Sequence, residues 1–472
     1  MTGDWAALRR VEQIEANLAE YGDVGRILHW VTAEHARQAE AERNGLLASM
    51  ENRLVESHKR TKPHLGPLSP GCRICGQGGW SCLFINGKCN CRCFYCPTTQ
   101  EEFGIPTTNR VPFPRAGDYA DYVRHFGFEG VSISGGEPLL TFDRTLNYIH
   151  KVRRRIGAGV HVWLYTNGVL LSETHLGKLS DAGLDEIRFD ISAVGYDLSK
   201  VRMAVGRIPC VTVEIPAIPE DRGRLSALLP EMRDARVDHL NLHQLRLTPH
   251  NLPRLAGRPY TFLHGEKVTV LESELTALSL MQEADSRGID LPMNYCSFVY
   301  KHRYQQSAAR KRSAQLMCKP HESVTDNGYI RCLSAAGPPE RIEAQIDLLE
   351  HRGADPLLWS ATGRKDRIHF NERLWPLLAF RADELRVRYA EAMLSPRISY
   401  RSAFKEVRLN PGASLYVERQ SRSQDFELLD DQKNAFEKTF ISRDSETTDP
   451  EILAGGRFAD YERIEEGLQR YF

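Results

Sequence analysis

Three cysteines within one short loop, Cys89, Cys93 and Cys96, constrain this chain more than any other feature. Their spacing, three residues and then two, is uncommon for zinc, whose sites usually combine two C-x2-C pairs. Cys72 and Cys75 form such a pair, so zinc stays an alternative. Four thiolates usually hold a cubane iron–sulfur cluster, and three therefore leave one iron open to another ligand. The spacing favours a [4Fe-4S] cluster with a free coordination position.

The sequence after this loop alternates between strand-like and helix-like segments, which is typical of a parallel sheet with helical crossovers. Six strands are expected, at 83–86, 130–134, 161–166, 186–191, 210–215 and 239–245. Helices are expected at 118–126 and 142–156, and a third should begin after its N-cap, Ser172. The predicted fold class is α/β, a partial (β/α)6 TIM-like barrel with an N-terminal helical extension and a mixed α+β C-terminal region. Functional residues should lie at the C-terminal ends of its strands.

Composition and turn signals divide the chain into four parts. These are a helical N-terminal extension at 1–63, the barrel at 71–290, a cysteine-containing auxiliary segment at 291–336, and a mixed α+β region at 337–472. The extension should form two helices that break at Gly22, with residues 27–31 in the second.

Beyond the last barrel strand, the sequence predicts individual turns and helices. Asn327-Gly328 and Asn410-Pro411-Gly412 predict tight hairpins. Helices are expected at 268–287, 341–351 and 373–392. The polar stretch 442–456 is typical of a flexible linker, and we expect a last amphipathic helix to end at Phe472.

A second motif, Gly135-Gly136-Glu137, directly follows the second expected strand and should share the rim of the cysteine loop. Two glycines let a backbone approach a ligand closely, and a carboxylate can bind an ammonium group. Gly-Gly alone is common in turns. Its position one βα unit after the cysteines is what indicates a ligand site.

Polar residues also end the next strands. Thr166 and Asn167 close the third strand, and Asp190 and Ser192 lie on one face at the end of the fourth. Ile215 ends the fifth and offers an apolar contact. An ordinary turn at Asn167, and a satisfied polar rim at Asp190 and Ser192, stay open as alternatives.

The cysteine loop, with Tyr95 before its last cysteine, and the Gly-Gly-Glu motif together resemble the signature of the radical S-adenosylmethionine (SAM) superfamily. More loosely, the chain resembles the branch related to pyruvate formate-lyase activating enzymes. The resemblance implies that Cys89, Cys93 and Cys96 are catalytic as ligands of the cluster. It also implies the cofactor-binding residues, which are Tyr95, Gly135, Gly136, Glu137, Thr166, Asn167, Asp190, Ser192 and Ile215.

In this resemblance Glu137 contacts the amino group of SAM. The ends of strands three and four contact its carboxylate and ribose, and Ile215 contacts adenine. The implied reaction is reductive cleavage of SAM to a 5′-deoxyadenosyl radical, which then abstracts hydrogen from a substrate. An electron donor of the flavodoxin or ferredoxin type is the implied partner.

The sequence does not name the substrate. We favour a peptide or protein, because the chain carries extra segments on both sides of the barrel. A small metabolite and modified RNA are alternatives, although the basic runs 301–303 and 310–312 are the main support for RNA and nucleic acid is not favoured. The rival from another class is a non-catalytic iron–sulfur or zinc-binding regulatory protein. Intact motifs argue against that rival.

The remaining cysteines suggest a second metal site. Cys72-x2-Cys75 has ligand spacing, and Cys296 lies beyond the barrel strands. Cys318 is the expected fourth ligand, and either a second iron–sulfur cluster or zinc would fit. Cys91 lies inside the main motif but out of register, so we expect it to fill space.

The charge and hydropathy of the chain bear on its possible partners. Lys plus Arg total 62 and Asp plus Glu total 62, so no global field favours nucleic acid or an anionic membrane. No apolar run of membrane-spanning length occurs, and the N-terminus lacks the pattern of a signal peptide. We therefore expect a cytoplasmic protein without a membrane partner, in which thiols stay reduced.

Overall fold

The computed structural model describes residues 5–378, 385–442 and 458–472. The chain forms two compact units. The barrel unit comprises residues 11–305, 409–413 and 465–472, and the C-terminal unit comprises residues 1–10, 306–408 and 414–464. None of the described helices combines the length and the apolar character that crossing a membrane requires.

A largely parallel sheet is the centre of the barrel unit, as the predicted fold class requires. Seven of its strands are mutually parallel and adjacent: β3 (Trp80–Asn86), β6 (Gly130–Gly135), β7 (His161–Thr166), β8 (Glu186–Phe189), β9 (Cys210–Pro216), β10 (His239–His243) and β13 (Met293–Cys296). The first six are the predicted strands. β13 is additional, because its four residues carry no alternation that sequence reasoning could detect.

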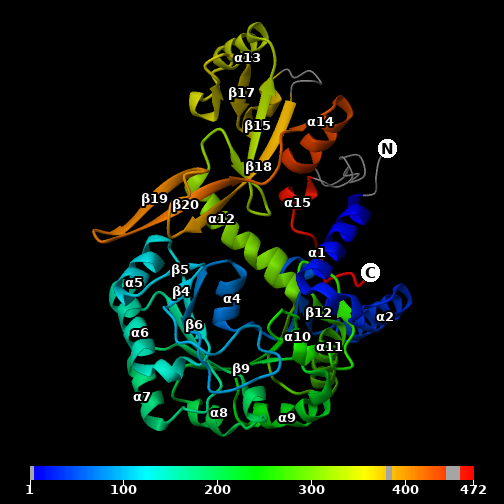
Figure 1. The fold of residues 1–472 in the computed structure, drawn as a ribbon, viewed down its shortest axis with the longest axis vertical. Coiled ribbons are helices and arrows are strands. Elements are labelled where there is room, and N and C mark those ends of the chain that lie inside the picture. Colours follow the sequence, from blue (N-terminus) through cyan, green and yellow to red (C-terminus); the bar gives the residue numbers. More distant parts are fainter. Residues whose placement is uncertain (1–4, 379–384, 443–457) are drawn as a thin grey trace. The chain divides into compact units, whose positions relative to one another are not determined.

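Helices connect these strands: α5 (Ala116–His125), α6 (Phe142–Ile156), α7 (Glu173–Asp181), α8 (Ser199–Ala204), α9 (Arg222–Asp234) and α11 (Leu271–Ser286). Figure 1 shows α5 to α9 following one another along the outside of the sheet. On α6 the buried residues are Thr145, Tyr148, Ile149 and Val152, which recur at helical spacing on the sheet-facing side. Ser172 caps α7 as predicted, since its side chain accepts from the His175 N–H.

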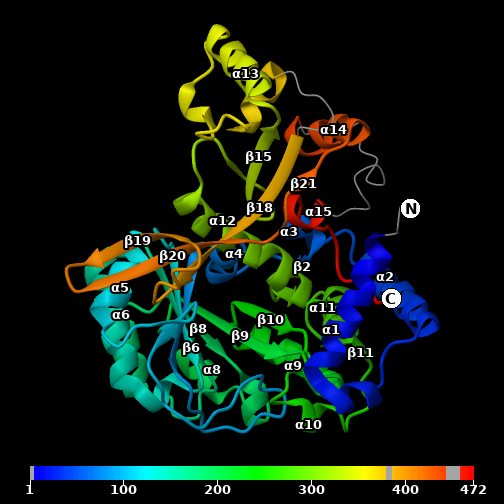
Figure 2. The same ribbon diagram turned by 45° about the horizontal axis from the view of Figure 1, so that its top comes forward.

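Shorter elements flank the parallel strands. β1 (Leu54–Glu56) and β2 (Lys62–Leu65) extend the sheet beyond β13, and β4 (Thr107–Thr108) and β5 (Val111–Pro112) extend it beyond β3. The other short elements are α3 (Ser57–Arg60), α4 (Pro70–Gly76), α10 (Leu252–Leu255), β11 (Phe262–Leu263) and β12 (Thr269–Val270). Figure 2 shows β6, β8, β9 and β10 side by side in the barrel unit.

The two N-terminal helices differ in part from the prediction. α1 (Trp5–Ile27) is kinked at Gly22, whose φ of 58° interrupts the helical backbone, and α2 (Ala33–Ser49) begins after the N-cap Thr32. The expected helical assignment of 28–31 is wrong. Trp30 pairs instead with Phe262 of β11, which buries this segment in extended form.

The C-terminal unit is built on an antiparallel sheet (Figure 1). Its strands are β14 (Ser323–Val324), β15 (Ile330–Ala336), β16 (Trp359–Ala361), β17 (Arg367–Phe370), β18 (Leu385–Ser395), β19 (Ala403–Asn410), β20 (Ala413–Ser421) and β21 (Phe426–Glu427). Its helices are α12 (Gln306–Met317), α13 (Pro339–His351), α14 (Asp430–Phe436) and α15 (Ala459–Glu462). The hairpins predicted at Asn327-Gly328 and Asn410-Pro411-Gly412 are confirmed.

Two helices expected in this region are wrong. Residues 385–395 form the strand β18, in which Leu385, Val387 and Tyr389 are buried on one face with a period of two. The expected last helix reaches only from Ala459 to Glu462, and the chain has no regular structure from there to Phe472. Most of the expected linker at 442–456 lies outside the described residues.

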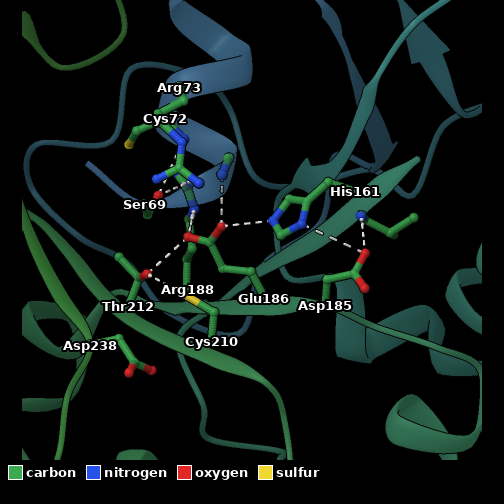
Figure 3. Close-up of polar contacts among 12 residues, drawn as sticks. Ser69, Cys72, Arg73, His161, Asp185, Glu186, Arg188, Cys210, Thr212 and Asp238 are labelled. Atoms are coloured by element: carbon green, nitrogen blue, oxygen red, sulfur yellow. Dashed lines mark hydrogen bonds and ion pairs between the residues drawn. The ribbon is translucent and has the colours of Figure 1, made fainter. Parts of the chain in front are cut away.

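A buried ionic network occupies the interior of the barrel unit. Arg188 on β8 donates to Glu186 at 2.8 Å and to Glu214 on β9 at 2.6 Å. Glu186 also accepts from Thr212 at 2.8 Å and faces His161 at 3.0 Å (Figure 3). Burial alone raises the pKa of Glu186, but Arg188 and His161 outweigh it and hold that pKa at about 2. Glu186 is therefore ionised whenever the protein is folded near neutral pH.

The short helix α4 is anchored on this network. Its N-cap Ser69 accepts from Arg188 at 3.1 Å, and the Gly71 N–H donates to Glu186 at 3.1 Å (Figure 3). A Cβ on Gly71 would overlap the Arg188 guanidinium, so only glycine allows this approach. The network thus fixes the helix that carries Cys72 and Cys75.

Arg188→Met should leave two buried carboxylates without their cation. Loss of one partner of a buried pair costs about 3 to 5 kcal/mol, so the urea midpoint of unfolding should fall well below that of the wild type. Arg233→Met is the matched control, because Arg233 is exposed and, among the described residues, its one ion pair is with its neighbour Asp234. Equal midpoints for the two variants would contradict the structural role of Arg188.

Candidate functional site

A cavity of about 350 Å³ opens at the carboxyl ends of the parallel strands. Its lining comes from the loop after β3 and from the ends of β6, β7, β8, β9 and β10, with two residues after β13. The predicted site residues that line it are Cys89, Cys93, Tyr95, Cys96, Gly135, Gly136, Glu137, Thr166, Asn167, Asp190 and Ile215. The cavity therefore brings together nearly all of the residues that the two motifs predicted.

Hydrogen-bond donors surround the cysteine sulfurs. The Gln100 amide donates to Cys96 Sγ at 3.0 Å, and the Cys91 N–H donates to Cys89 Sγ at 3.4 Å. The Asn167 amide also lies at 3.7 Å from Cys89 Sγ. Sulfur accepts hydrogen bonds best as a thiolate, so these donors fit metal-bound thiolates. Cys91, which was expected to fill space, contributes this backbone donor and lines the cavity.

Without metal the thiols of Cys89 and Cys93 are protonated near neutral pH. Burial raises the pKa of Cys93 to about 12, and it raises the pKa of Cys89 as well. Thiol ligands must lose their protons to bind metal, so metal uptake releases protons. As they stand, no three His, Cys, Asp or Glu side chains in the described part of the chain are arranged to hold a metal ion, and this includes Cys89, Cys93 and Cys96.

Tyr95 joins the cysteine loop to the end of β8. Its hydroxyl donates to Asp190 at 2.9 Å and lies 2.6 Å from the Ser192 hydroxyl. Burial raises the pKa of Asp190, although these hydroxyls act in the opposite direction. Ser192 is not among the cavity-lining residues, and its contact with Tyr95 and Asp190 gives it a positioning role in the structure.

Three residues that sequence reasoning missed support the cysteine loop from 248–254. The buried Asn251 amide donates to the Tyr95 carbonyl at 3.1 Å. Thr248 donates to the Pro97 carbonyl at 3.2 Å, and Arg254 donates to the Cys93 carbonyl at 3.0 Å. All three act on backbone oxygens, which leave no motif in the sequence of the loop. The segment lies about 150 residues away from its targets, which removes any local signal.

The glycines of the Gly-Gly-Glu motif allow two segments of the chain to pack closely against each other. A Cβ on Gly135 would overlap the Asn86 carbonyl, and a Cβ on Gly136 would overlap the Lys88 carbonyl. Gly135 also has φ of 132°, which disfavours other residues. The two glycines therefore let the end of β6 lie directly against the start of the cysteine loop.

Glu137 connects this motif to the end of β7. Its Oε1 accepts from Leu139 N–H and from the Thr166 hydroxyl, both at 2.9 Å, and its Oε2 accepts from Asn167 N–H at 2.8 Å. Burial raises the pKa of Glu137, which these three donors oppose. Oε2 accepts one of these bonds and can accept another, so the carboxylate can still receive an ammonium donor.

The expected second site is divided between the two units. Cys72, Cys75 and Cys296 lie in the barrel unit, outside the cavity lining. Cys318 belongs to the C-terminal unit, where its charged neighbours are Glu322, Arg419 and Glu372.

Asn251→Ala should loosen the cysteine loop without removing a cysteine. The change deletes the donor to Tyr95 and leaves a buried carbonyl unsatisfied, which costs about 1 to 3 kcal/mol locally. We expect iron retained after anaerobic reconstitution and desalting to fall severalfold, with near-wild-type circular dichroism. Asn147→Ala, at an exposed position of α6, should retain wild-type iron. Equal iron in both variants would contradict the supporting role of Asn251.

Known proteins resemble parts of this chain. The Radical SAM superfamily model matches residues 83–213. A protein of Methanocaldococcus jannaschii described as a putative glycyl-radical enzyme activating enzyme is 29% identical over 287 residues, which are 58% of this chain and 75% of that protein. A probable GTP 3′,8-cyclase of Methanococcus aeolicus is 32% identical over 119 residues, which are 25% of this chain and 38% of the cyclase.

Among solved structures, Streptococcus suis SuiB bound to S-adenosylmethionine has a TM-score of 0.37 and 11% identity, with 68% of this chain and 69% of that chain covered. The region matched by the family model contains the cysteine loop, the Gly-Gly-Glu motif and the ends of β6, β7 and β8 that line the cavity. Residues 83–213 are a radical SAM domain, and the protein is a radical SAM enzyme.

Proposed function

We propose that this enzyme cleaves SAM reductively in the cavity described above and abstracts hydrogen from a peptide or protein substrate. The observation that carries the proposal is the convergence of Cys89, Cys93 and Cys96 with Glu137 on one cavity at the carboxyl ends of parallel strands. Cysteines that served only to fill space would not need a loop whose backbone carbonyls accept hydrogen bonds from the side chains of a distant segment.

The donor chemistry of the residues present fits the cofactors that the family implies. The three thiols would hold a [4Fe-4S] cluster, and their N–H donors suit ligating sulfur. When bound, the cluster and SAM supply one-electron cleavage of the sulfonium, which gives methionine and a 5′-deoxyadenosyl radical. The cavity provides a partly enclosed space of about 350 Å³ beside these thiols.

Residues of the chain itself would bind SAM and orient it in the cavity. Glu137 has one acceptor position left for the SAM ammonium group, while its other bonds fix the carboxylate rigidly. Asn167 donates to Asn90 at 2.7 Å, which ties the end of β7 to the cysteine loop. Asp190 lines the cavity beside Tyr95, and Ile215 offers apolar surface for adenine.

A protein substrate is supported by the relative that is named a putative glycyl-radical enzyme activating enzyme, of which this chain covers 75%. A small nucleotide substrate has the weaker support of the cyclase match, in which the chain spans less than half of the relative. We further propose a flavodoxin- or ferredoxin-type electron donor and a reducing, cytoplasmic setting, which suits the eleven free cysteines.

Anaerobic reconstitution with iron and sulfide, followed by SAM and dithionite, should yield 5′-deoxyadenosine and methionine in equal amounts. The variant with Cys89, Cys93 and Cys96 all changed to Ala should yield neither above background. Cys91→Ala is the matched control and should retain cleavage. Product formation by the triple variant, or none by the wild type loaded with iron, would refute the proposed function.

A second metal site is proposed at the three thiols of the barrel unit. The Asn241 amide donates to Cys72 Sγ at 3.3 Å, and the Gln305 amide donates to Cys75 Sγ. Cys75 also lies within electrostatic reach of Cys72 and Cys296, and burial raises the pKa of Cys75 to about 12. Two of these sulfurs thus have amide donors, as the sulfurs of Cys89 and Cys96 do.

Lys62 supports this second site. Its side chain is fully buried, and its ammonium lies 4.4 Å from the ring centroid of Tyr300. Burial lowers the pKa of Lys62, but the thiols of Cys296, Cys72 and Cys75 outweigh it and raise that pKa. The Lys62 charge acts to lower the pKa of Cys75, against the larger effect of burial. Either iron or zinc would suit these three thiols.

Metal analysis of the Cys89/Cys93/Cys96 triple variant isolates the second site. About four residual irons per chain would support a second cluster, and about one zinc would support a structural site. Adding Cys72→Ala and Cys75→Ala should remove this metal, whereas adding Cys210→Ala should not, because Cys210 pairs with Thr212 instead. A metal-free triple variant would contradict the second site.

A further inference from the structure

One part of the cavity wall is not used by the proposed SAM site. It is formed by the end of β10 and by the turn after β13, and its residues are His243, Gln244, Arg246, Phe298 and Lys301. We call these five residues the basic wall. No motif of the family resemblance includes them.

Lys301 is oriented by a chain of partly buried contacts. Its ammonium lies 2.7 Å from His243 Nδ1, and His243 Nε2 lies 2.6 Å from Glu214. Nδ1 must accept from the ammonium and Nε2–H must donate to the carboxylate, so His243 is neutral. Burial and Lys301 lower the pKa of His243, which agrees with that state. Arg188 in turn holds Glu214, so the buried network fixes where the Lys301 charge lies.

Arg246 brings a second positive charge to the same place. The Lys301 ammonium lies 5.1 Å from the Phe298 ring centroid, and the Arg246 guanidinium carbon lies 5.4 Å from it. Burial lowers the pKa of Arg246, which Tyr21 and Glu20 offset only in part. Two cations around one ring in a partly buried wall repel each other.

Within the described ranges, neither Lys301 nor Arg246 forms an ion pair with a carboxylate. The cation–π contacts with Phe298 are worth only about 0.5 to 2 kcal/mol each, which is less than the cost of burying an unpaired charge. The one carboxylate that lines this part of the wall is Glu214, and Arg188 and His243 already engage it. The wall therefore has an excess of positive charge.

Gln244 independently indicates that this part of the cavity binds a ligand. Its side chain is 4% exposed and lines the cavity. Its Oε1 accepts from the Phe298 N–H at 3.1 Å, which fixes the orientation of the amide. Its Nε2 is buried and has no hydrogen-bond partner in the described structure. Such a donor is costly to leave unpaired, and an acceptor from a ligand would satisfy it.

We propose that the basic wall is a substrate subsite that binds an oxyanion, a carboxylate or a phosphate, between Lys301, Arg246 and the Gln244 amide. The inference rests on the proposed function, because it places this anion beside the group that loses hydrogen. In a peptide or protein the oxyanion is an acidic side chain or a terminal carboxylate. A charge-assisted contact of this kind fixes orientation as well as affinity.

The competing explanation is that the wall binds the carboxylate of SAM. That carboxylate has another candidate contact at the end of β7, where the Asn167 amide lines the cavity. The two explanations differ in one observable. If the wall serves the substrate, removing its charge leaves SAM affinity unchanged.

Calorimetric titration of the reconstituted, SAM-loaded protein with succinate, inorganic phosphate and neutral succinamide tests the subsite. The wild type should bind succinate or phosphate and not succinamide, and the better of the two anions identifies the source of the oxyanion. Lys301→Met and Arg246→Met should each weaken that anion at least tenfold, with SAM affinity unchanged. Lys301→Arg should retain most binding, and the surface variant Arg233→Met should match the wild type.

A tenfold loss of SAM affinity in Lys301→Met would overturn the proposal, because the wall would then hold the SAM carboxylate. Anion binding that is unchanged in both Met variants, or absent from the wild type at millimolar concentration, would overturn it as well. Iron content and circular dichroism show that each variant is folded and loaded. Uncoupled SAM cleavage in the same preparations reports separately on the proposed function, so the two failures are distinguishable.

Discussion

The ion pairs of Arg188 with Glu186 and Glu214 are the interaction on which the rest of the barrel unit depends. Arg188 is 3% exposed, and a charge at that depth persists only when it is fully paired. The network reaches α4 through Ser69 and Gly71, and it reaches the cavity through Glu214, His243 and Lys301. One buried cation thus positions both the helix that carries Cys72 and Cys75 and the charged part of the cavity wall.

The cavity itself depends on close backbone contact between two loops. Gly135 and Gly136 lie against Asn86 and Lys88, where any side chain would overlap a carbonyl. Glu137 then fastens the same loop to the end of β7 through Asn167, which also reaches the cysteine loop. The Gly-Gly-Glu motif therefore connects these parts of the structure. Its proposed contact with SAM uses the acceptor position of Glu137 that these connections leave free.

Sequence reasoning recovered the features that local patterns encode. Short apolar segments, and helical segments that end at a glycine, predicted the six strands and α6. The position of the motifs at the ends of these strands predicted most of the cavity-lining residues. β13 was missed because four residues are too few for a period. The strand β18 was mistaken for a helix because the pattern of 373–392 was read with a period of 3.6, whereas Leu385, Val387 and Tyr389 alternate. The contacts of Asn251 and Lys301 are non-local, so no spacing in the sequence could reveal them.

In the proposed cluster at Cys89, Cys93 and Cys96, one iron lacks a cysteine ligand and can bind SAM. Mössbauer spectroscopy of protein reconstituted with iron-57, recorded with and without SAM, tests it most directly. We expect the signal of one iron per cluster to shift on addition of SAM, while the other three keep their parameters. Four irons that are equally insensitive to SAM, in protein with a full complement of iron, would contradict it.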